Sequence, residues 1–230
     1  MKLTLVAKRS ETEDVMSFVF RSDAPLSWQP GQFLHYRLPH QEPDERGITR
    51  YFTIASAPFE QHVVLTTRFA SGRSSSFKRA LRQLPVGATI DVDAPDGDFV
   101  LAEPGQEHVL MAGGIGITPF RAILLELDHH QLPITATLLY ANRTRDFVYQ
   151  AELDGLTSRH PRLAVRYLVS PARITDASIR EGVVDLAKPV FHVSGPEPFV
   201  EAVGTMLAGL GVPDAHVKRD YFPGYAWPTV

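Results

Sequence analysis

The stretch His108-Val109-Leu110-Met111-Ala112-Gly113-Gly114-Ile115-Gly116-Ile117-Thr118-Pro119 decides the fold of this chain. An apolar strand runs into a glycine-rich turn, and the turn runs into the start of a helix. Glycine lets the backbone turn sharply and approach a ligand, because it has no Cβ. Thr118 suits the N-cap of the helix, and Pro119 suits the first helical position.

The free N–H groups at such a helix start can bind a pyrophosphate. Three glycines, Gly113, Gly114 and Gly116, together with a capped helix start predict a nucleotide-binding turn, and the alternative is a tight turn that binds nothing. Pro119 stands at the last position of the pattern, which therefore differs from the G-x-G-x-x-G fingerprint of ordinary dehydrogenases.

Strands and helices alternate around this turn toward the C-terminus. The expected strands are 108–112, 134–140, 163–169 and 190–193, and the expected helices are 119–128, 149–157 and 197–209. Alternation of this kind predicts a doubly wound parallel sheet.

The first hundred residues have a different pattern, which is typical of an antiparallel barrel or sandwich. Short strands are expected at 15–20, 33–38, 51–55, 63–69 and 89–92, with one helix near 74–84. The pattern changes near Ala102-Glu103-Pro104-Gly105, so we expect two domains, residues 1–102 and 103–230.

Composition narrows the class of protein. The net charge of −3 and the absence of a long basic run argue against nucleic acid binding. There are no cysteines, which excludes disulfides, zinc bound by cysteine and iron–sulfur clusters held by thiolates. The apolar start of the chain is too short for a signal peptide, and no apolar run is long enough for a transmembrane helix. We therefore expect a cytoplasmic protein whose redox chemistry, if it has any, depends on a bound organic cofactor or on another metal.

Two segments of the first domain could bind a phosphate and a flat ring. In Arg50-Tyr51-Phe52-Thr53-Ile54-Ala55-Ser56, Arg50 and Thr53 can reach a phosphate and Phe52 can stack on a ring. Gly72-Arg73-Ser74-Ser75-Ser76-Phe77 places a glycine and hydroxyls at a helix start, which is another arrangement that binds anions. Taken singly, each segment also fits an ordinary strand or an ordinary helix cap.

Together, the segments resemble the ferredoxin–NADP reductase family. The family's Arg-x-aromatic-Ser/Thr-x-x-Ser, Gly-x-x-Ser and Gly-Gly-x-Gly-x-Thr-Pro elements match residues 50–56, 72–75 and 113–119, in the family's order. Ser194-Gly195-Pro196 matches its Cys-Gly-Pro segment, except that a serine replaces the cysteine. The resemblance covers nearly the whole chain. It implies a six-stranded antiparallel barrel that binds FAD, with FMN less expected, followed by a nucleotide-binding α/β domain that binds NAD(P)H.

The resemblance also implies roles for individual residues. Thr53, Thr118, Ser194 and Asp220 are expected near the reaction centre, and Phe52 is expected to stack on the isoalloxazine ring. The residues expected to bind the two cofactors are Arg50, Tyr51, Phe52, Thr53, Thr66, Arg68, Gly72, Ser74, Ser75, Gly113, Gly114, Gly116, Thr118, Pro119, Arg143, Ser170, Arg173, Gly195, Phe222, Tyr225 and Trp227.

The end of the chain, Arg219 to Trp227, resembles the family's acidic-x-Phe-x-Gly-Tyr ending. Phe222, Tyr225 and Trp227 are each candidates for a ring that covers the flavin until nicotinamide displaces it, and packing of the C-terminus is the alternative. Arg143 and Arg173 could bind a 2′-phosphate, which slightly favours NADPH over NADH.

The predicted reaction is hydride transfer from NAD(P)H to the flavin, followed by electron transfer to an external acceptor such as ferredoxin, flavodoxin, an oxygenase component or a small quinone. A monomer or weak dimer is expected. The alternatives are a flavin-binding module without turnover and a flavin reductase that uses flavin as a diffusible substrate. Metal-dependent hydrolysis and a serine nucleophile have no supporting motif in the sequence.

Overall fold

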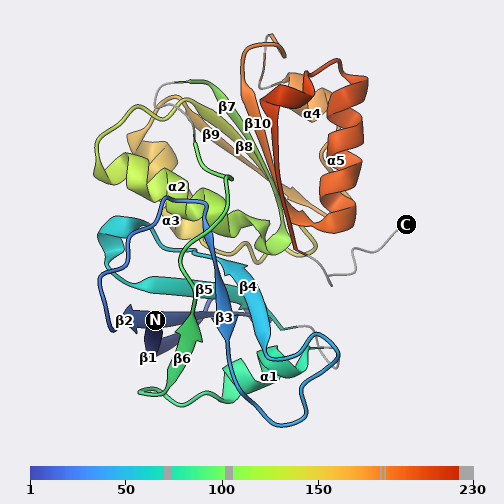
Figure 1. The fold of residues 1–230 in the computed structure, drawn as a ribbon. Coiled ribbons are helices and arrows are strands. Elements are labelled where there is room, and N and C mark those ends of the chain that lie inside the picture. The colour runs from blue at the N-terminus through green and yellow to red at the C-terminus, as the bar shows by residue number, and fades with distance from the viewer. Residues whose placement is uncertain (70–73, 102–105, 182, 184, 223–230) are drawn as a thin grey trace.

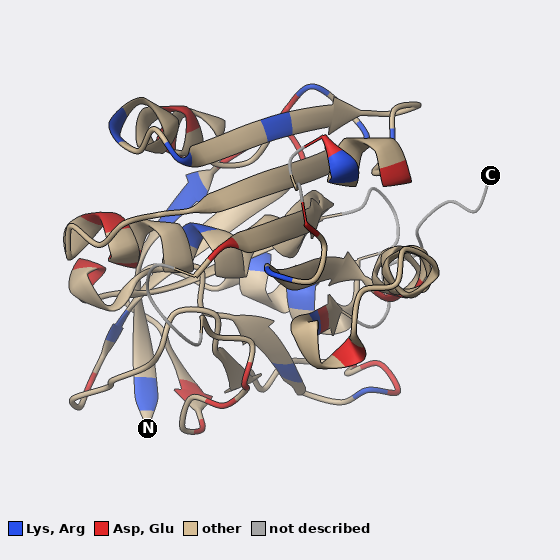
Figure 2. Ribbon diagram, turned by 90° about the horizontal axis from the view of Figure 1, so that it is seen from above, with Lys and Arg blue, Asp and Glu red and all other residues tan. Residues whose placement is uncertain are grey.

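The computed structural model describes residues 1–69, 74–101, 106–181, 183 and 185–222, and these residues form two parts (Figure 1). The predicted domain boundary at 102/103 falls outside the described residues. Positively and negatively charged residues are interspersed along the ribbon in Figure 2 rather than gathered in one block. No helix among the described residues combines the length and apolar character that crossing a membrane requires.

The first part is a six-stranded antiparallel sheet curled into a barrel, as predicted. Its strands lie in the order β4-β3-β6-β1-β2-β5. Their bounds are β1 Lys2–Ser10, β2 Val15–Ser22, β3 Phe33–Arg37, β4 Thr49–Thr53, β5 Val63–Arg68 and β6 Thr89–Val92. Apolar side chains that alternate along the strands fill the interior, including Leu3, Leu5, Phe18, Phe20 and Leu65.

The short helix η1, Pro58–Glu60, precedes β5, and helix α1, Ser76–Gln83, lies between β5 and β6. Helix α1 buries Phe77 and Leu81 in the barrel core.

Strand β1 is absent from the sequence-based prediction, which tested the start of the chain only for a signal peptide and found its apolar stretch too short. In the structure β1 lies inside the sheet, between β6 and β2. Leu3 and Leu5 point inward and are fully buried, in the alternating pattern of a strand that has one face on the core.

The second part is a five-stranded parallel sheet in the order β11-β10-β7-β8-β9. The strands are β7 His108–Gly113, β8 Ala136–Asn142, β9 Leu163–Val169, β10 Val190–Pro196 and β11 Val217–Phe222. The helices are η2 Gly114–Gly116, α2 Ile117–His129, α3 Gln150–Arg159, α4 Asp176–Arg180, α5 Glu197–Gly209 and η3 Asp214–His216.

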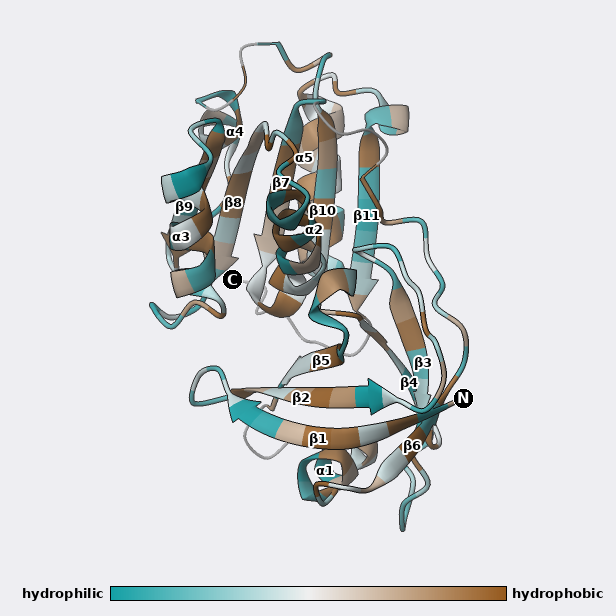
Figure 3. Ribbon diagram, turned by 90° about the vertical axis from the view of Figure 1, so that its left-hand side faces the viewer, coloured by the Kyte–Doolittle hydropathy of each residue, from teal (hydrophilic) through white to brown (hydrophobic). Residues whose placement is uncertain are grey.

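Both faces of this sheet are covered, as a doubly wound fold requires. Leu110 and Ala112 of β7 share one apolar cluster with helices α2 and α3, whereas Val109 and Met111 share another with α4 and α5. A strand that is buried on both faces is largely apolar, and Figure 3 shows mostly hydrophobic colouring along β7 and β8.

Three local predictions for this part need correction. Helix α2 begins at Ile117, so Gly116 is its N-cap and Thr118 and Pro119 lie inside its first turn. The cause is the turn η2, which continues directly into the helix because Gly116 and Ile117 already have helical backbone angles. Residues 217–222 form the edge strand β11, whereas the sequence suggested only an ending over residues 219–227, and α4 was not predicted.

Candidate functional site

A cleft of about 700 Å³ lies where the barrel meets the carboxyl edge of the parallel sheet. Residues of both parts line it, and ten of the 21 residues predicted to bind the cofactors are among them. The lining residues are Asp44, Glu45, Arg46, Thr49, Arg50, Tyr51, Phe52, Thr53, Thr66, Arg68, Ser74, Ser75, Lys78, Ile115, Thr118 and Phe222. The topology explains this meeting, because the turn after β7, the start of α2 and the end of β11 all lie at the carboxyl edge, where α/β sheets bind ligands.

One end of the cleft carries two basic side chains, two serines and one carboxylate. We call this group the anion end, and it consists of Asp44, Arg50, Ser75, Ser76 and Lys78. Ser75 is the N-cap of α1, and its hydroxyl accepts a hydrogen bond from the Lys78 N–H. The start of a helix is a favourable place for a phosphate. Gly72, which was predicted to share this role, lies outside the described residues.

A protein carboxylate already occupies part of the anion end. Asp44 forms an ion pair with Arg50 and accepts a 3.0 Å hydrogen bond from the Ser76 N–H. The other terminal nitrogen of Arg50 donates to three backbone carbonyls, those of Arg46, Gly47 and Thr49. Burial alone would raise the pKa of Asp44, but the bonds from Ser76 and the charge of Arg50 outweigh it and lower that pKa to about 2. Asp44 is a site residue that the sequence analysis missed.

The centre of the cleft carries aromatic rings and threonine hydroxyls. Phe52 lines the cleft, and its partly buried ring also packs against Tyr36 and Phe77 of the barrel core at centroid distances of 5.9 and 5.8 Å. Tyr51, on the opposite face of β4, packs against Phe33 and His35. The surrounding hydroxyls are those of Thr53, Thr66 and Thr118, all of which are buried.

The glycine turn faces the cleft, but packing between protein segments explains part of its composition. A Cβ on Gly116 would lie 2.0 Å from the Ser194 carbonyl oxygen, so the close approach of η2 to β10 requires glycine. Gly114 has a φ of +56°, which glycine adopts readily, and its Cβ position is open. Thr118 donates its hydroxyl to the Ile115 carbonyl at 3.1 Å, which fixes the turn against the helix.

Ser194 and Asp220 form a pair beside the cleft and are not part of its lining. They are register partners on β10 and β11, and the Ser194 hydroxyl donates to Asp220 Oδ2 at 3.0 Å. Burial raises the pKa of Asp220 to about 6, and the hydrogen bond from Ser194 opposes that rise. The pKa of Tyr51 is raised by burial first and then by the nearby Tyr221 and Asp220, so Asp220 lies within electrostatic range of the cleft.

The remaining predicted residues lie around this centre. Gly113 and Gly195 pack closely on Phe199, and Pro119 is buried in α2. Arg143 lines a second cleft of about 730 Å³, which shares Arg68 and Ser74 with the first.

Ser170 and Arg173 are exposed beyond β9 and line neither cleft. Tyr225 and Trp227 lie outside the described residues.

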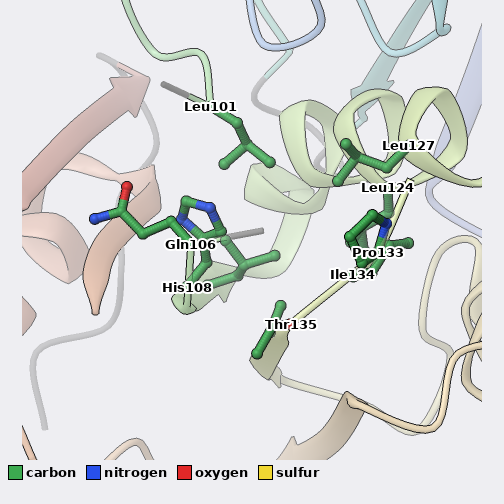
Figure 4. Close-up of a pocket in the computed structure, with 10 residues that line it drawn as sticks. Leu101, Gln106, His108, Leu124, Leu127, Pro133, Ile134 and Thr135 are labelled. Carbon is green, nitrogen blue, oxygen red and sulfur yellow. The ribbon is translucent and has the colours of Figure 1, made fainter. Parts of the chain in front are cut away.

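Elsewhere in the described part of the chain there is a much smaller pocket. A small pocket at the amino ends of β7 and β8 is lined mainly by apolar side chains such as Leu101, Leu124 and Leu127, with His108 at one side (Figure 4). Its volume of about 10 Å³ is roughly that of one water molecule. No group of three or more metal-ligating side chains gathers to hold a metal ion within the residues described.

Comparison with known proteins gives a consistent result. Residues 2–101 match the oxidoreductase FAD-binding domain, and residues 110–205 match the oxidoreductase NAD-binding domain. The chain is 33% identical over 242 residues to the ferredoxin reductase component of 3-ketosteroid-9-alpha-monooxygenase from Mycobacterium tuberculosis, covering 96% of the chain and 65% of the relative. It is 28% identical to a flavohemoprotein from a Burkholderia species, covering 94% of the chain and 57% of that protein. The chain therefore spans about 57–65% of the length of these curated relatives.

Among solved structures, the FAD/NAD-binding domain of nitric oxide dioxygenase from Vibrio cholerae superposes with a TM-score of 0.82. Its sequence identity is 22%, with coverage of 96% of this chain and 98% of that one. At this identity the match speaks for the fold alone, and it confirms the predicted arrangement of a barrel followed by a doubly wound sheet.

Proposed function

Because the chain belongs to the ferredoxin reductase-like family of two-domain flavin and nicotinamide oxidoreductases, we propose that it oxidises NAD(P)H through FAD and passes the electrons to an external acceptor. The observation that carries the proposal is the cleft of about 700 Å³, which both domains line. A site of this kind can hold two planar reactants against each other, and such positioning is the protein's main contribution when a cofactor supplies the chemistry.

The lining of the cleft fits FAD in chemical character. Phe52 and Tyr51 offer aromatic surface to a flat ring system, and the threonine hydroxyls offer hydrogen bonds to its polar edge. Arg50, Lys78 and the N-terminus of α1 offer positive charge to a diphosphate. A bound flavin supplies the capacity to accept a hydride and to release electrons one or two at a time.

The protein residues have distinct proposed tasks. Thr53 on the barrel side and Thr118 on the nucleotide side hold the two ring systems by hydrogen bonds, whereas Thr66 lines the barrel wall with its hydroxyl bonded to Ser17 and Tyr149. Phe222 lines the cleft from β11 and covers the flavin face until a nicotinamide takes its place. Asp220 holds or releases a proton at its carboxylate near pH 6, with Ser194 fixing the orientation of that carboxylate.

We propose a slight preference for NADPH over NADH. Arg143 and Arg173 follow β8 and β9 at the carboxyl edge of the sheet, and both are exposed and able to meet a 2′-phosphate. The ratio of kcat/KM for NADPH and NADH in Arg143→Ala and Arg173→Ala tests this assignment. An unchanged ratio in both variants would refute it.

The acceptor is proposed to be a small redox protein or an oxygenase component. The relatives named ferredoxin reductase component and glycine betaine monooxygenase reductase subunit support this class of partner. A small quinone is the non-protein alternative.

A second candidate function rests on the anion end. The Asp44 carboxylate on Arg50 opposes the charge of a diphosphate, which would favour a flavin reductase that releases its flavin after each turnover.

The test is the visible spectrum of the purified protein, followed by anaerobic addition of NADPH or NADH. Flavin bands that bleach with one nucleotide support the reductase with bound FAD. Rapid reduction of added flavin by a colourless protein supports the second candidate. Tight flavin that neither nucleotide reduces would indicate a binding module, and a colourless protein that neither binds flavin nor oxidises nucleotide would refute every one of these functions.

A further inference from the structure

Tyr149 of the nucleotide domain reaches into the barrel. Its ring is almost fully buried, and its hydroxyl lies within hydrogen-bond distance of Thr66 Oγ1 and, at 3.3 Å, of Ser17 Oγ. Ser17 and Thr66 are themselves 2.7 Å apart, so three hydroxyls from β2, β5 and the residue before α3 form a buried triangle. Each of these groups can both donate and accept, and the triangle satisfies them where water is excluded.

The backbone of Tyr149 shows that its position is strongly determined. Its φ of 63° and ψ of 17° lie in the left-handed region, which is unfavourable for a residue with a bulky side chain. A strained residue of this kind persists only where the surrounding contacts fix it. For Tyr149 the contacts of the hydroxyl are with the other domain.

Arg121 of α2 makes a second set of bridges to the barrel. Its two terminal nitrogens bind both carboxylate oxygens of Glu60, at 2.9 and 3.1 Å, and one of them also donates to the Ala55 carbonyl at 2.9 Å. Glu152 of α3 is 2.9 Å away, and the guanidinium lies over the Tyr149 ring at 4.8 Å from its centroid. Arg121 therefore joins both domains and also connects to the first bridge.

These contacts adjoin the residues that face the cleft. Thr66 is itself part of the lining, Ala55 follows the lining residue Thr53 by two positions, and Arg121 follows Thr118 by one helical turn. We use the name domain clamp for Arg121, Tyr149, Glu60, Ser17 and Thr66. Any shift of the clamp changes the separation between Thr118 on one wall of the cleft and Thr53 and Thr66 on the other.

We propose that Arg121 and Tyr149 are positioning residues that hold the nucleotide domain at a fixed distance from the barrel and thereby set how closely the nicotinamide ring can approach the flavin. The inference rests on the function proposed above for the cleft. Arg121 and Tyr149 act without touching either cofactor, since neither of them lines the cleft.

Arg121 and Tyr149 keep their protons over the ordinary pH range. Burial by itself would lower the pKa of Arg121, but the hydrogen bonds that Arg121 donates to Glu60 and the surrounding charges, including Glu152, raise it overall. Burial raises the pKa of the Tyr149 hydroxyl to about 12, so the hydroxyl keeps its proton. We therefore expect the clamp to act as a permanent spacer and not as a switch.

The absence of cysteine from the chain allows a direct structural test. Val86→Cys in the barrel and Glu201→Cys on α5 introduce two exposed sites for spin labels, and double electron–electron resonance then gives the distribution of distances between the domains. Tyr149→Phe removes only the bridging hydroxyl. Tyr167→Phe is the matched control, because that hydroxyl donates to Asp154 on the outside of the same domain.

We expect Tyr149→Phe to broaden or shift the distance distribution and Tyr167→Phe to leave it unchanged. The rate of anaerobic flavin reduction at saturating nucleotide should fall about 10- to 100-fold in Tyr149→Phe, with little change in KM or in flavin affinity. Arg121→Lys keeps the charge but loses the bidentate contact with Glu60, so its effects on the distance distribution and on the reduction rate should be intermediate.

Ser17→Ala is a second, milder variant that removes a barrel-side hydroxyl without touching the cleft lining. An unchanged distance distribution in Tyr149→Phe, Arg121→Lys and Ser17→Ala would overturn the inference, as would a changed distribution with an unchanged reduction rate. If the parent protein reduces no flavin, the proposed function has failed, and the distance measurements still report whether the clamp holds the domains.

Discussion

The Ser194 hydroxyl donates a hydrogen bond to Oδ2 of Asp220 at 3.0 Å, and the two residues face each other across the β10–β11 ladder. The carboxylate is mostly enclosed, and its pKa is raised to about 6 by burial, which disfavours the charged form. Since the Ser194 bond stabilises the carboxylate, it holds that pKa below the value that burial alone would give.

A pH profile of NAD(P)H oxidation should therefore show an inflection near pH 6. Asp220→Asn should remove the inflection, because the amide does not titrate. Ser194→Ala should move it to higher pH, because the bond that favours the carboxylate is lost. A profile that is the same in all three proteins would show that Asp220 has no part in turnover.

Asp44 gives a prediction about flavin binding. Its pKa of about 2 means that it is charged at every working pH, and it faces the end of the cleft assigned to the phosphates. Asp44→Asn keeps an acceptor for the Ser76 N–H and removes the charge, so FAD should bind about 10-fold more tightly. Isothermal titration measures this, with riboflavin as the control ligand because it has no phosphate. Equal changes for FAD and riboflavin would contradict the assignment of the anion end.

Gly116 gives a prediction about stability. Gly116→Ala places a Cβ 2.0 Å from the Ser194 carbonyl, and backbone atoms of β10 would have to move. We expect a loss of about 3 kcal/mol or more in the free energy of unfolding. Gly209→Ala, at the end of α5 with nothing within 4 Å of the added atom, should be neutral or stabilise by up to about 1 kcal/mol. Urea unfolding of the two variants separates these outcomes, and similar losses in both would contradict the packing argument.

His192 should make the fold sensitive to acid. It is fully buried, with its ring against Phe99 and His108, and burial, then the charges of His108 and Lys218, lower its pKa to about 3. Its unfolded pKa is near 6.5, so the unfolded chain takes up a proton between pH 6.5 and pH 3 and the folded chain does not. Stability from this residue is thus complete above pH 6.5 and is lost on acidification, at up to about 1.4 kcal/mol per pH unit.

The measurement is the free energy of unfolding between pH 7 and pH 4 for the parent and for His192→Leu, which has a similar volume and cannot titrate. Asp220 acts in the opposite direction between about pH 6 and pH 4, so the difference between the two proteins is the informative quantity. Equal slopes in the parent and in His192→Leu would show that His192 is protonated in the folded state.

Much of the fold could be predicted from the sequence, because strongly periodic or uniformly apolar segments are recognisable as helices or strands without knowledge of their neighbours. Strands β6 and β9 and helix α5 lie at their predicted bounds. Strand β11 could not be recognised, since charged residues occupy its middle and only its ends, Val217 and Phe222, are buried. Lys218, Arg219 and Asp220 in succession are typical of a loop, and the partner strand β10 supplies the stabilisation that the local sequence lacks.

Many of the residues that line the cleft could be predicted from the sequence, but the residues that join the two domains beside it could not. Motifs in the sequence marked Arg50, Thr53 and Thr118, whereas Tyr149 looked like an ordinary helix residue and Arg121 like an interruption of an apolar run. Their importance depends on contacts with residues more than 60 positions away, such as Arg121 with Glu60 and Tyr149 with Thr66. No local pattern encodes such contacts.

The order of strands in the barrel has a consequence for the protein without its cofactor. Strands β4 and β5 stand at the two ends of the sheet order. The Ala55 N–H, just after β4, donates a hydrogen bond to the Val64 carbonyl of β5, at the place where a full ladder would close the barrel. The cleft residues Thr53 and Thr66 lie on these two edge strands. Another polypeptide chain can add a strand at a sheet edge. A flavin bound in the cleft would lie over the edges of β4 and β5. Self-association during production should therefore depend on the riboflavin supply of the host cell, and protein purified with excess flavin should remain monodisperse for longer.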